Sequence, residues 1–472
     1  MSMPFQPERA ILELDSRFHS EVEPADFPQH TIRWRNQRWA ERVGLGGLSD
    51  AEWVEHFGRF APLEGSLEKP LALAYHGHQF QSYNPNIGDG RGFLFAQMRD
   101  DKGRLLDLGT KGSGRTPWSR TGDGRLTLKG GMREVLAAGM LEALGVYTSK
   151  AFSLIETGEQ LARNDEPSPT RSSVLVRLSH SHIRFGAFQR LAYAGDVDGV
   201  GKLVDYCIRH YHPAAQGADM EASAAGLLRE VTLATAELAA QWMAAGFVHG
   251  VLNTDNMVVT GESFDYGPWR FLPYSDPSFI AAYFDETGLY AFGRQPSAAL
   301  WNLSQLASAL TLVCSVPALE KELDRFETLY RDAFRRRVLR VLGLQSKGEE
   351  ADLALFKLFF GWMGETRASW PQVFFDWFGG RASETRAGAG PLSALYRTPG
   401  FAPVQAALMA HEPERPERLE HPYFKNPEPV SLLIEQVEAI WEPIAAADDW
   451  AAFARCMDQI DVARQAVALD QG

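Results

Sequence analysis

The sequence predicts an α+β protein with two lobes of unequal size, and two changes of texture along the chain support this. From about residue 71 to 182 the chain is rich in glycine and in short runs that alternate apolar and polar residues, which is typical of strands. From about residue 220 onward, long stretches with apolar residues at helical spacing dominate. We therefore expect an N-terminal extension at 1–70 that packs on the core, a small β-rich lobe at 71–182 and a larger helical lobe at 183–472.

Charge and composition exclude several classes of protein. The 472 residues hold 47 Lys and Arg against 60 Asp and Glu, a net charge of −13, so neither nucleic acid nor an anionic membrane is an expected partner. Three cysteines, Cys207, Cys314 and Cys456, lie far apart without zinc or disulfide spacing. Neither a secretory signal pattern nor a run of about 18 apolar residues occurs. The sequence therefore predicts a soluble, cytoplasmic protein.

A Gly-rich turn at 87–92, IGDGRG, is the first candidate for a phosphate-binding element. It precedes two apolar-rich runs, 92–100 and 104–110, separated by a turn that contains Gly103, and this pattern predicts a β-hairpin. Glycines in such a turn let backbone N–H groups approach phosphate without a Cβ in the way. Taken alone, the pattern also fits an ordinary hairpin turn. The candidate residues are Gly88, Gly90 and Arg91.

Lys111 ends the second of these strands, next to the Gly-rich turn. Apolar residues at helical spacing predict a helix at 132–145, and Glu134 in its first turn is the obvious partner for the lysine. A strand lysine that is held by a helix glutamate and directed at phosphates is the arrangement of protein kinases. The competing interpretation, a P-loop, requires a spacing that GTKGSG does not have.

Further candidates come from a second glycine turn and from two arginines. SRTGDGR (119–125) contains Asp123 and Gly124, and VLVRLSHSHIRFG contributes Arg177 and Arg184. Each arginine on its own fits a surface position. Together they offer more guanidinium groups than an ordinary kinase phosphate site uses.

The stretch HGVLNTDN (249–256) follows a helix predicted at about 221–245 and resembles a kinase catalytic loop. Asn256 ends it and Asp265 opens DYG, which parallels the Asn and Asp that hold Mg²⁺ in kinases. Val251 stands where the catalytic aspartate is expected, and valine cannot accept a proton. Two explanations stay open: a protein that only binds nucleotide, or a different transfer in which Asp255, otherwise a turn-capping residue, is the base.

The remaining chain is predicted mainly as helix. Two short strand-like pieces are expected at 257–260 and around Phe264. After residue 297 helical patterns continue, with a break near Pro317 and a loop through the Gly-rich, Pro-containing segment 379–404.

In this order the motifs resemble those of the selenoprotein O (SelO) family, whose members have a two-lobed protein-kinase-like fold. The blocks that carry the resemblance are YHGHQF (75–80), IGDGRG (87–92), SRTGDGR (119–125), RE (133–134), GFVHGVLNTDNM (246–257), DYGP (265–268) and QPSAALWNLSQLA (295–307). The resemblance covers roughly residues 71–310. It implies that ATP binds in a flipped orientation and that AMP, rather than phosphate, is transferred to protein hydroxyls.

The resemblance also assigns roles to the candidate residues. It implies that Asp255 is the proton acceptor, that Asn256 and Asp265 hold Mg²⁺ or Mn²⁺, and that Glu134 orients Lys111. The implied ATP contacts are Gly88, Gly90, Arg91, Lys111, Asp123, Gly124, Arg177, Arg184 and Asp265. The implied function is a protein adenylyltransferase that acts on Ser, Thr or Tyr hydroxyls of proteins. A kinase-like phosphotransferase and a catalytically inactive ATP-binding pseudokinase are the alternatives.

Overall fold

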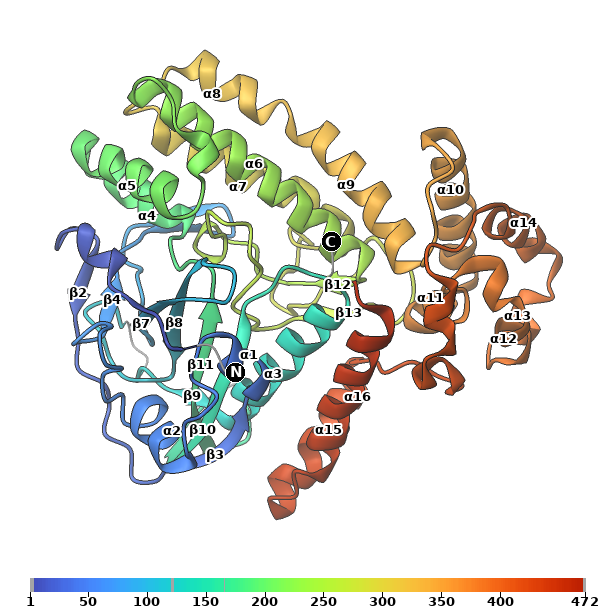
Figure 1. The fold of residues 1–472 in the computed structure, drawn as a ribbon, viewed down its shortest axis with the longest axis horizontal. Coiled ribbons are helices and arrows are strands. Elements are labelled where there is room, and N and C mark those ends of the chain that lie inside the picture. Colours follow the sequence, from blue (N-terminus) through green and yellow to red (C-terminus); the bar gives the residue numbers. More distant parts are fainter. Residues whose placement is uncertain (1–3, 120–122, 165, 470–472) are drawn as a thin grey trace.

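The computed structural model describes residues 4–119, 123–164 and 166–469 and confirms a mixed α+β protein (Figure 1). An antiparallel sheet occupies the N-terminal part, and helices make up most of the C-terminal part. The strands of the sheet are β1 (Pro7–Glu8), β2 (His19–Glu21), β3 (Thr31–Arg35), β4 (Leu71–Leu73), β7 (Leu94–Arg99), β8 (Leu105–Lys111), β9 (Leu126–Thr127), β10 (Lys150–Leu161) and β11 (Thr170–Ser179). Two small pairs stand apart, β5 (Gly77–Gln79) with β6 (Ser82–Asn84) and β12 (Phe247–Val248) with β13 (Arg270–Phe271).

The sheet has the strand order β2-β4-β7-β8-β11-β10-β3, with β1 paired to β7 and β9 paired to β11. The predicted hairpin is confirmed as β7 and β8, in which Arg99 lies opposite Leu105. On the other edge of β8, Lys111 lies opposite Leu175 and Gly109 lies opposite Arg177. Because residues two apart on a strand share a face, Lys111 and Arg177 project from the same side of the sheet.

Residues before position 70 contribute to the same sheet. Strands β1, β2 and β3 pair with β7, β4 and β10. Helices α1 (Gln37–Arg42) and α2 (Asp50–Phe57) follow β3, and α2 begins with a capping box between Ser49 and Glu52. Trp53 of α2 is fully buried and stacks on Phe152 at 5.1 Å between ring centroids. The division of the chain at residues 70 and 182 stays a prediction.

Helix α3 (Leu128–Ala143) packs on the sheet and carries Glu134 (Figure 1). It begins four residues before the predicted start, because the Thr127 hydroxyl caps it by accepting a hydrogen bond from the Gly130 N–H at 3.1 Å. Leu128, Met132 and Leu136 are fully buried on this helix, and each such side chain contributes about 1.5–3 kcal/mol of burial free energy.

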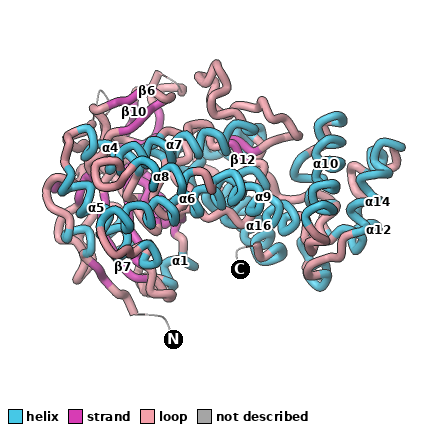
Figure 2. Tube along the Cα trace, turned by 90° about the horizontal axis from the view of Figure 1, so that it is seen from above, coloured by secondary structure: helices cyan, strands magenta, loops and turns pink. Residues whose placement is uncertain are grey.

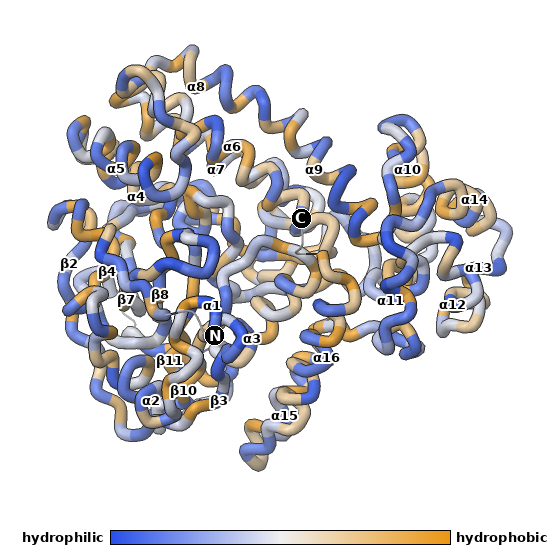
Figure 3. The backbone as a smooth tube through the Cα atoms, in the orientation of Figure 1, coloured by the Kyte–Doolittle hydropathy of each residue, from blue (hydrophilic) through white to orange (hydrophobic). Residues whose placement is uncertain are grey.

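The helical part is organised around α6 (Met220–Ala244), which confirms the helix predicted at about 221–245. Around it lie α4 (Phe185–Tyr193), α5 (Val197–His210), α7 (Gln295–Leu310), α8 (Val316–Leu323) and α9 (Phe326–Val341). Hydrophobic and hydrophilic residues alternate along α8 and α9 (Figure 3), as expected for helices with one buried face. The break predicted near Pro317 lies between α7 and α8, with Pro317 in the first turn of α8.

An outer group of helices lies beyond α9, to one side of the sheet and α6 (Figure 2). It consists of α10 (Glu349–Thr366), α11 (Trp370–Asp376), α12 (Glu384–Ala389), α13 (Ser393–Tyr396) and α14 (Ala402–Ala410). The loop predicted at 379–404 is therefore wrong, since this segment forms short helices. Its glycines and prolines delimit those helices: Gly390 ends α12 and Pro403 lies in the first turn of α14.

The chain ends in α15 (Ile434–Ala447) and α16 (Ala451–Val467). Helix α16 packs against α3, where Met457 and Ile460 lie next to Gly139. Because Gly139 has no side chain, the two helices approach closely. The C-terminal helix therefore supports the helix that carries Glu134.

The two short strands predicted after residue 256 are wrong as regular strands. Val258 forms an isolated bridge with Arg184, and Ser263 forms one with Thr148. Only one residue of each piece pairs, because the chain turns at Gly261, where φ is +66°.

In the described ranges, no helix is both long enough and apolar enough to cross a lipid bilayer. Cys207, Cys314 and Cys456 are buried free thiols.

Candidate active site

A cavity of about 750 Å³ collects residues from segments far apart in the sequence. Eleven of the twelve predicted site residues line it: Gly88, Gly90, Arg91, Lys111, Asp123, Gly124, Arg177, Arg184, Asp255, Asn256 and Asp265. Glu134 does not line the cavity but contacts Lys111 behind it. The side chains therefore share one cleft, although what each of them does there stays a prediction.

Lys111 lies at the centre of a buried charge cluster. Its Nζ donates hydrogen bonds to Glu134 Oε1 and to Asp265 Oδ1, so one lysine joins α3 to the segment after the catalytic-loop motif. Arg177 Nη1 lies 3.4 Å from Asp265 Oδ1 and 3.8 Å from Glu134 Oε2. Two cations and two carboxylates thus balance one another. Lys111, Glu134 and Arg177 are nearly closed to solvent, whereas 23% of the Asp265 side chain is exposed in the cavity.

Asp265 is held in place by its backbone. Its φ is +65°, a left-handed conformation that costs free energy for a residue other than glycine. The preceding carbonyl, of Phe264, lies 3.0 Å from Nε2 of the fully buried His249 ring. Burial would raise the pKa of Asp265, but Lys111, Arg177 and Arg184 hold that pKa well below its usual range. Asp265 is therefore a fixed carboxylate at ordinary pH.

The Gly-rich turn packs against Trp118. A Cβ on Gly88 would come within 2.5 Å of the Trp118 ring, and a Cβ on Gly92 would lie 2.0 Å from the Thr110 carbonyl oxygen. The Ser119 hydroxyl donates to the Gly90 carbonyl. Gly88 and Gly92 are thus needed because a side chain at either position would collide with a neighbour of the turn. Arg91 is exposed at the rim and has no ion-pair partner among the described residues.

Asp123 and Gly124 lie at the mouth of the cavity, on the turn whose residues 120–122 are outside the described ranges. Arg163 donates to both carboxylate oxygens of Asp123, at 2.9 and 3.0 Å. Gly124 has φ +73°, and a Cβ there would lie 2.2 Å from the Gly114 carbonyl oxygen. Asp123 therefore holds the Arg163 side chain at the mouth of the cavity, where Arg91 is also exposed.

Arg184 is buried and fixes the catalytic-loop backbone. Its Nη1 donates to the Asp255 carbonyl oxygen at 2.6 Å, and its Nη2 lies 3.2 Å from Asp89 Oδ1. Asp89 also accepts from the Leu73 N–H at 3.0 Å. Both Nη atoms of Arg184 thus have partners inside the protein. Arg184 therefore positions the backbone at Asp255 and is also a candidate phosphate contact.

Asp255 is a buried carboxylate with few hydrogen-bond partners among the described residues. Its Oδ1 is buried without a hydrogen-bond partner among the described residues, and its Oδ2 lies 3.5 Å from Gln79 Nε2. Burial raises the pKa of Asp255 to about 6, although Arg184 opposes the rise. A carboxylate with a pKa near neutrality can both accept a proton and release it again.

Strand β5 and the turn after it support the loop that carries Asp255. The His78 N–H donates to Thr254 Oγ1 at 2.7 Å, and the Phe80 N–H donates to Asn253 Oδ1 at 3.0 Å. The Tyr290 hydroxyl also donates to Asn253 Oδ1, at 2.9 Å. The YHGHQF motif therefore positions the loop that carries Asp255.

Asn256 and Asp265 offer oxygen donors that suit Mg²⁺ or Mn²⁺. The Asn256 Nδ2 donates to the Val251 carbonyl at 2.9 Å, which leaves Oδ1 as the group able to bind a cation. Over residues 4–119, 123–164 and 166–469, no group of three or more His, Cys, Asp or Glu side chains is placed to hold a metal. The donor chemistry therefore fits Mg²⁺ or Mn²⁺, for which Asn256 and Asp265 would supply two oxygen ligands.

Several residues that line the cavity are absent from the sequence-based candidates: Tyr75, Gln79, Asp89, Trp118, Arg125 and Arg163. Tyr75 and Gln79 lie in the YHGHQF motif, and Asp89 lies within IGDGRG, so these motifs were a usable signal. Arg163 has no such signal, since it contacts a residue 40 positions earlier in the chain.

The chain is similar to known proteins over nearly its whole length. A model of the family described as "Protein adenylyltransferase SelO" matches residues 2–461. The "Protein nucleotidyltransferase YdiU" of Synechocystis sp. is 42% identical over 469 residues, which cover 96% of this chain and 97% of that protein. The protein of the same name from Gloeobacter violaceus is 44% identical over 462 residues, 94% of this chain and 93% of that protein.

Proposed function

Because this chain belongs to the SelO family of protein adenylyltransferases, we propose that it transfers AMP from ATP to Ser, Thr or Tyr hydroxyls of proteins. Membership makes the chain a protein nucleotidyltransferase, an enzyme of the transferase class. One observation carries the finer proposal: a cation cluster, an oxygen-donor pair and a carboxylate with a raised pKa line one cavity.

The proposed fold class is a two-lobed kinase-like architecture, with the cavity between the lobes. Its support is the order of parts along the chain: the Gly-rich turn, the strand lysine, the helix glutamate, the catalytic loop and the aspartate of DYG. The contact of Lys111 with both Glu134 and Asp265 joins three of these parts.

In the proposed reaction, Asp255 removes the proton from the acceptor hydroxyl as its oxygen attacks the α-phosphorus of ATP. The bond between the α-phosphorus and the bridging oxygen breaks, and pyrophosphate leaves. The raised pKa of Asp255 suits this task, since the carboxylate is ionised at neutral pH and still basic enough to hold the proton. A base four residues after Val251 explains why valine is tolerated at that position.

The arginine and lysine side chains are proposed to bind the triphosphate. Six residues that line the cavity are cationic against four carboxylates, and the cations are Arg91, Lys111, Arg125, Arg163, Arg177 and Arg184. Charge-assisted and bidentate hydrogen bonds from such groups are the strongest that phosphate oxygens accept. Arg91, exposed and unpaired among the described residues, is the best placed to meet an incoming phosphate.

Asn256 and Asp265 are the residues proposed to hold Mg²⁺ or Mn²⁺. Such an ion, when bound, neutralises phosphate charge and polarises the reacting phosphoryl group. Asp265 is prepared for this role because its carboxylate stays ionised, and Lys111 holds one of its oxygens meanwhile.

The surface next to the catalytic loop supports a protein as the acceptor. Tyr283 and Phe284 are large aromatic residues with exposed fractions of 84% and 48%, and their rings lie 5.2 Å apart. Phe284 also contacts Phe80, at 5.9 Å between ring centroids, and the Phe80 N–H is bound to Asn253 of the loop. Exposed aromatic residues of this kind mark surfaces that bind other proteins. A cytoplasmic location stays a prediction.

Labelled ATP tests the proposed function. The protein is incubated with Mg²⁺ or Mn²⁺ and a mixture of acceptor proteins, using ATP labelled at the α-phosphate in one reaction and at the γ-phosphate in another. Protein-bound label from the α-phosphate alone is the expected result. Label from the γ-phosphate alone would establish a kinase instead, and ATP binding without label would establish an inactive pseudokinase.

A further inference from the structure

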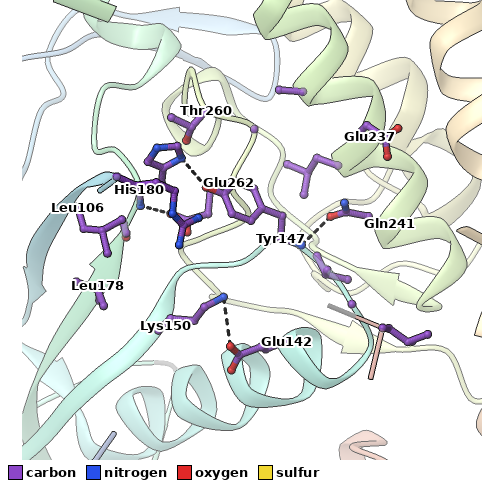
Figure 4. Close-up of a pocket in the computed structure, with 18 of the residues that line it drawn as sticks. Leu106, Glu142, Tyr147, Lys150, Leu178, His180, Glu237, Gln241, Thr260 and Glu262 are labelled. Atoms are coloured by element: carbon purple, nitrogen blue, oxygen red, sulfur yellow. Dashed lines mark hydrogen bonds and ion pairs between the residues drawn. The ribbon is translucent and has the colours of Figure 1, made fainter. Parts of the chain in front are cut away.

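A second cavity, of about 330 Å³, lies where the sheet approaches helix α6 (Figure 4). Leu106 of β8 and Leu178 of β11 form one wall, and Glu237 and Gln241 of α6 form another. The two cavities share no described lining residue. This second cavity is therefore separate from the first, and it lies between the sheet and the helical part. We call it the rear pocket.

The lining of the rear pocket holds more cations than carboxylates, although the protein as a whole is acidic. Three of its lining residues are glutamates and six are lysines or arginines, namely Arg42, Lys102, Arg104, Lys150, Arg337 and Arg340. The chain as a whole carries a charge of −13. An excess of positive charge inside a cleft concentrates anions from solution.

Two of these cations have their own carboxylate partners beside the rear pocket, since Arg104 lies 2.7 Å from Asp100 and Arg42 lies 3.0 Å from Asp101. The lining glutamates Glu142 and Glu237 are each shared between two cations. Glu142 contacts Arg38 and also lies 3.7 Å from Lys150, as Figure 4 shows for the lysine. Glu237 contacts Arg336 and lies 3.5 Å from Arg337. Lys102 is exposed at the mouth and forms no ion pair with any residue in the described ranges.

The charge of Arg337 is incompletely compensated. Burial lowers its pKa, Glu237 offsets part of this effect, and the neighbouring Arg340 lowers the pKa further. An anion placed in the rear pocket would relieve this repulsion and replace the lost hydration of the guanidinium group.

The size and the walls of the rear pocket indicate an organic ligand. Its volume is within the range of small-molecule sites, about 300–1,000 Å³, and far exceeds the roughly 30 Å³ that one water molecule takes up in the liquid. Leu106, Val146, Leu178 and Leu238 supply apolar surface. A bare inorganic ion would leave most of this surface without contact.

We propose that the rear pocket binds a small organic anion that carries phosphate or carboxylate groups and that this ligand acts as an effector of the enzyme. Its anionic groups contact Lys102, Arg337 and their cationic neighbours, and its carbon skeleton packs against the leucine wall.

Backbone contacts connect the rear pocket to Asp265. The Ser263 N–H donates to the Tyr147 carbonyl at 2.8 Å, and the Ser149 N–H donates to the Ser263 carbonyl at 2.9 Å. Tyr147 lines the rear pocket, and Ser263 precedes Asp265 by two residues. A ligand that orders the 147–149 segment therefore also orders the backbone that aims Asp265 into the ATP cavity. By thermodynamic reciprocity, nucleotide binding changes the affinity for the effector by the same factor.

Calorimetric titration of the full chain tests this proposal without relying on transfer activity. The probes are ribose 5-phosphate and citrate, with sodium chloride as the ionic-strength control. A non-hydrolysable ATP analogue with Mg²⁺ is present at saturation, so that the candidate active site is filled. We expect at least one probe to bind, which assigns the ligand to the phosphate or to the carboxylate class.

Variants identify the pocket. Lys102→Glu and Arg337→Gln are expected to weaken probe binding about tenfold, because each removes a positive charge beside the ligand. Lys357→Glu, the same change at an exposed lysine outside both cavities, is expected to leave binding unchanged. Lys102 is exposed, so its variant keeps the test decisive if Arg337→Gln does not fold. Binding of neither probe, or equal affinity of the wild type and the Lys102→Glu protein, would overturn the proposal.

Discussion

Replacing Asp255 with Asn is expected to slow nucleotide transfer by about 10²- to 10⁴-fold, the usual contribution of a general base, and to leave ATP binding almost unchanged. Asn has the same shape as Asp, and the Arg184 contact is made to the backbone carbonyl of residue 255, which the substitution keeps. The lost property is basicity, because an amide cannot accept the hydroxyl proton. In free energy the loss corresponds to about 2.7–5.5 kcal/mol of transition-state stabilisation.

The assay measures the rate of label transfer from α-labelled ATP, together with the dissociation constant of a non-hydrolysable analogue. Asp332→Asn, at an exposed position on α9, serves as the matched control and is expected to behave as the wild type. An Asp255→Asn enzyme that keeps full activity would refute the assignment of the base. A large loss of nucleotide affinity would instead show that residue 255 acts in binding.

The remaining predictions concern the same cavity and its surroundings. Glu134→Gln is expected to slow transfer at least tenfold. Breaking a buried ion pair costs about 3–5 kcal/mol, and Lys111 would then contact Asp265 alone. An unchanged rate would show that Glu134 has no role in the reaction. The transfer rate should fall as the pH drops through about 6, because Asp255 then takes up a proton. Gln79→Leu should shift this fall in rate to higher pH, since the Gln79 hydrogen bond lowers the pKa of Asp255. A transfer rate that stays constant from pH 5 to 8 would contradict this. The double substitution of Tyr283 and Phe284 by Ser should raise the KM for a protein acceptor severalfold without changing ATP affinity, and equal KM values would exclude the aromatic surface from docking. Removal of divalent metal by EDTA should abolish transfer, and added Mg²⁺ or Mn²⁺ should restore it.

Much of the site could be predicted because its parts are local motifs. The hairpin that ends at Lys111 follows from alternation and a glycine turn, and Glu134 follows from helical spacing after it. These signals need only a few neighbouring residues. The SelO membership expected from the order of the motifs is confirmed by the family match over residues 2–461.

Features that depend on long-range packing were not predictable in the same way. The contact of Arg163 with Asp123 joins the connection between β10 and β11 to the turn before β9, 40 residues earlier. The positions of Trp118 and Asp89 depend on how two turns pack together. The segment 379–404 illustrates a different difficulty, since glycine and proline indicate the ends of short helices as readily as a loop. Tertiary packing decides between the two, and here the buried Tyr396 and Phe401, with ring centroids 4.9 Å apart, favour helices.

The most direct test of AMP transfer is the mass of an acceptor protein after reaction with ATP and Mg²⁺, followed by mapping of the modified residue. We expect a mass increase of one AMP group on a Ser, Thr or Tyr side chain with the wild-type enzyme and no increase with Asp265→Ala. An increase of one phosphate group, or AMP transfer at full yield by the Asp265→Ala enzyme, would contradict this expectation.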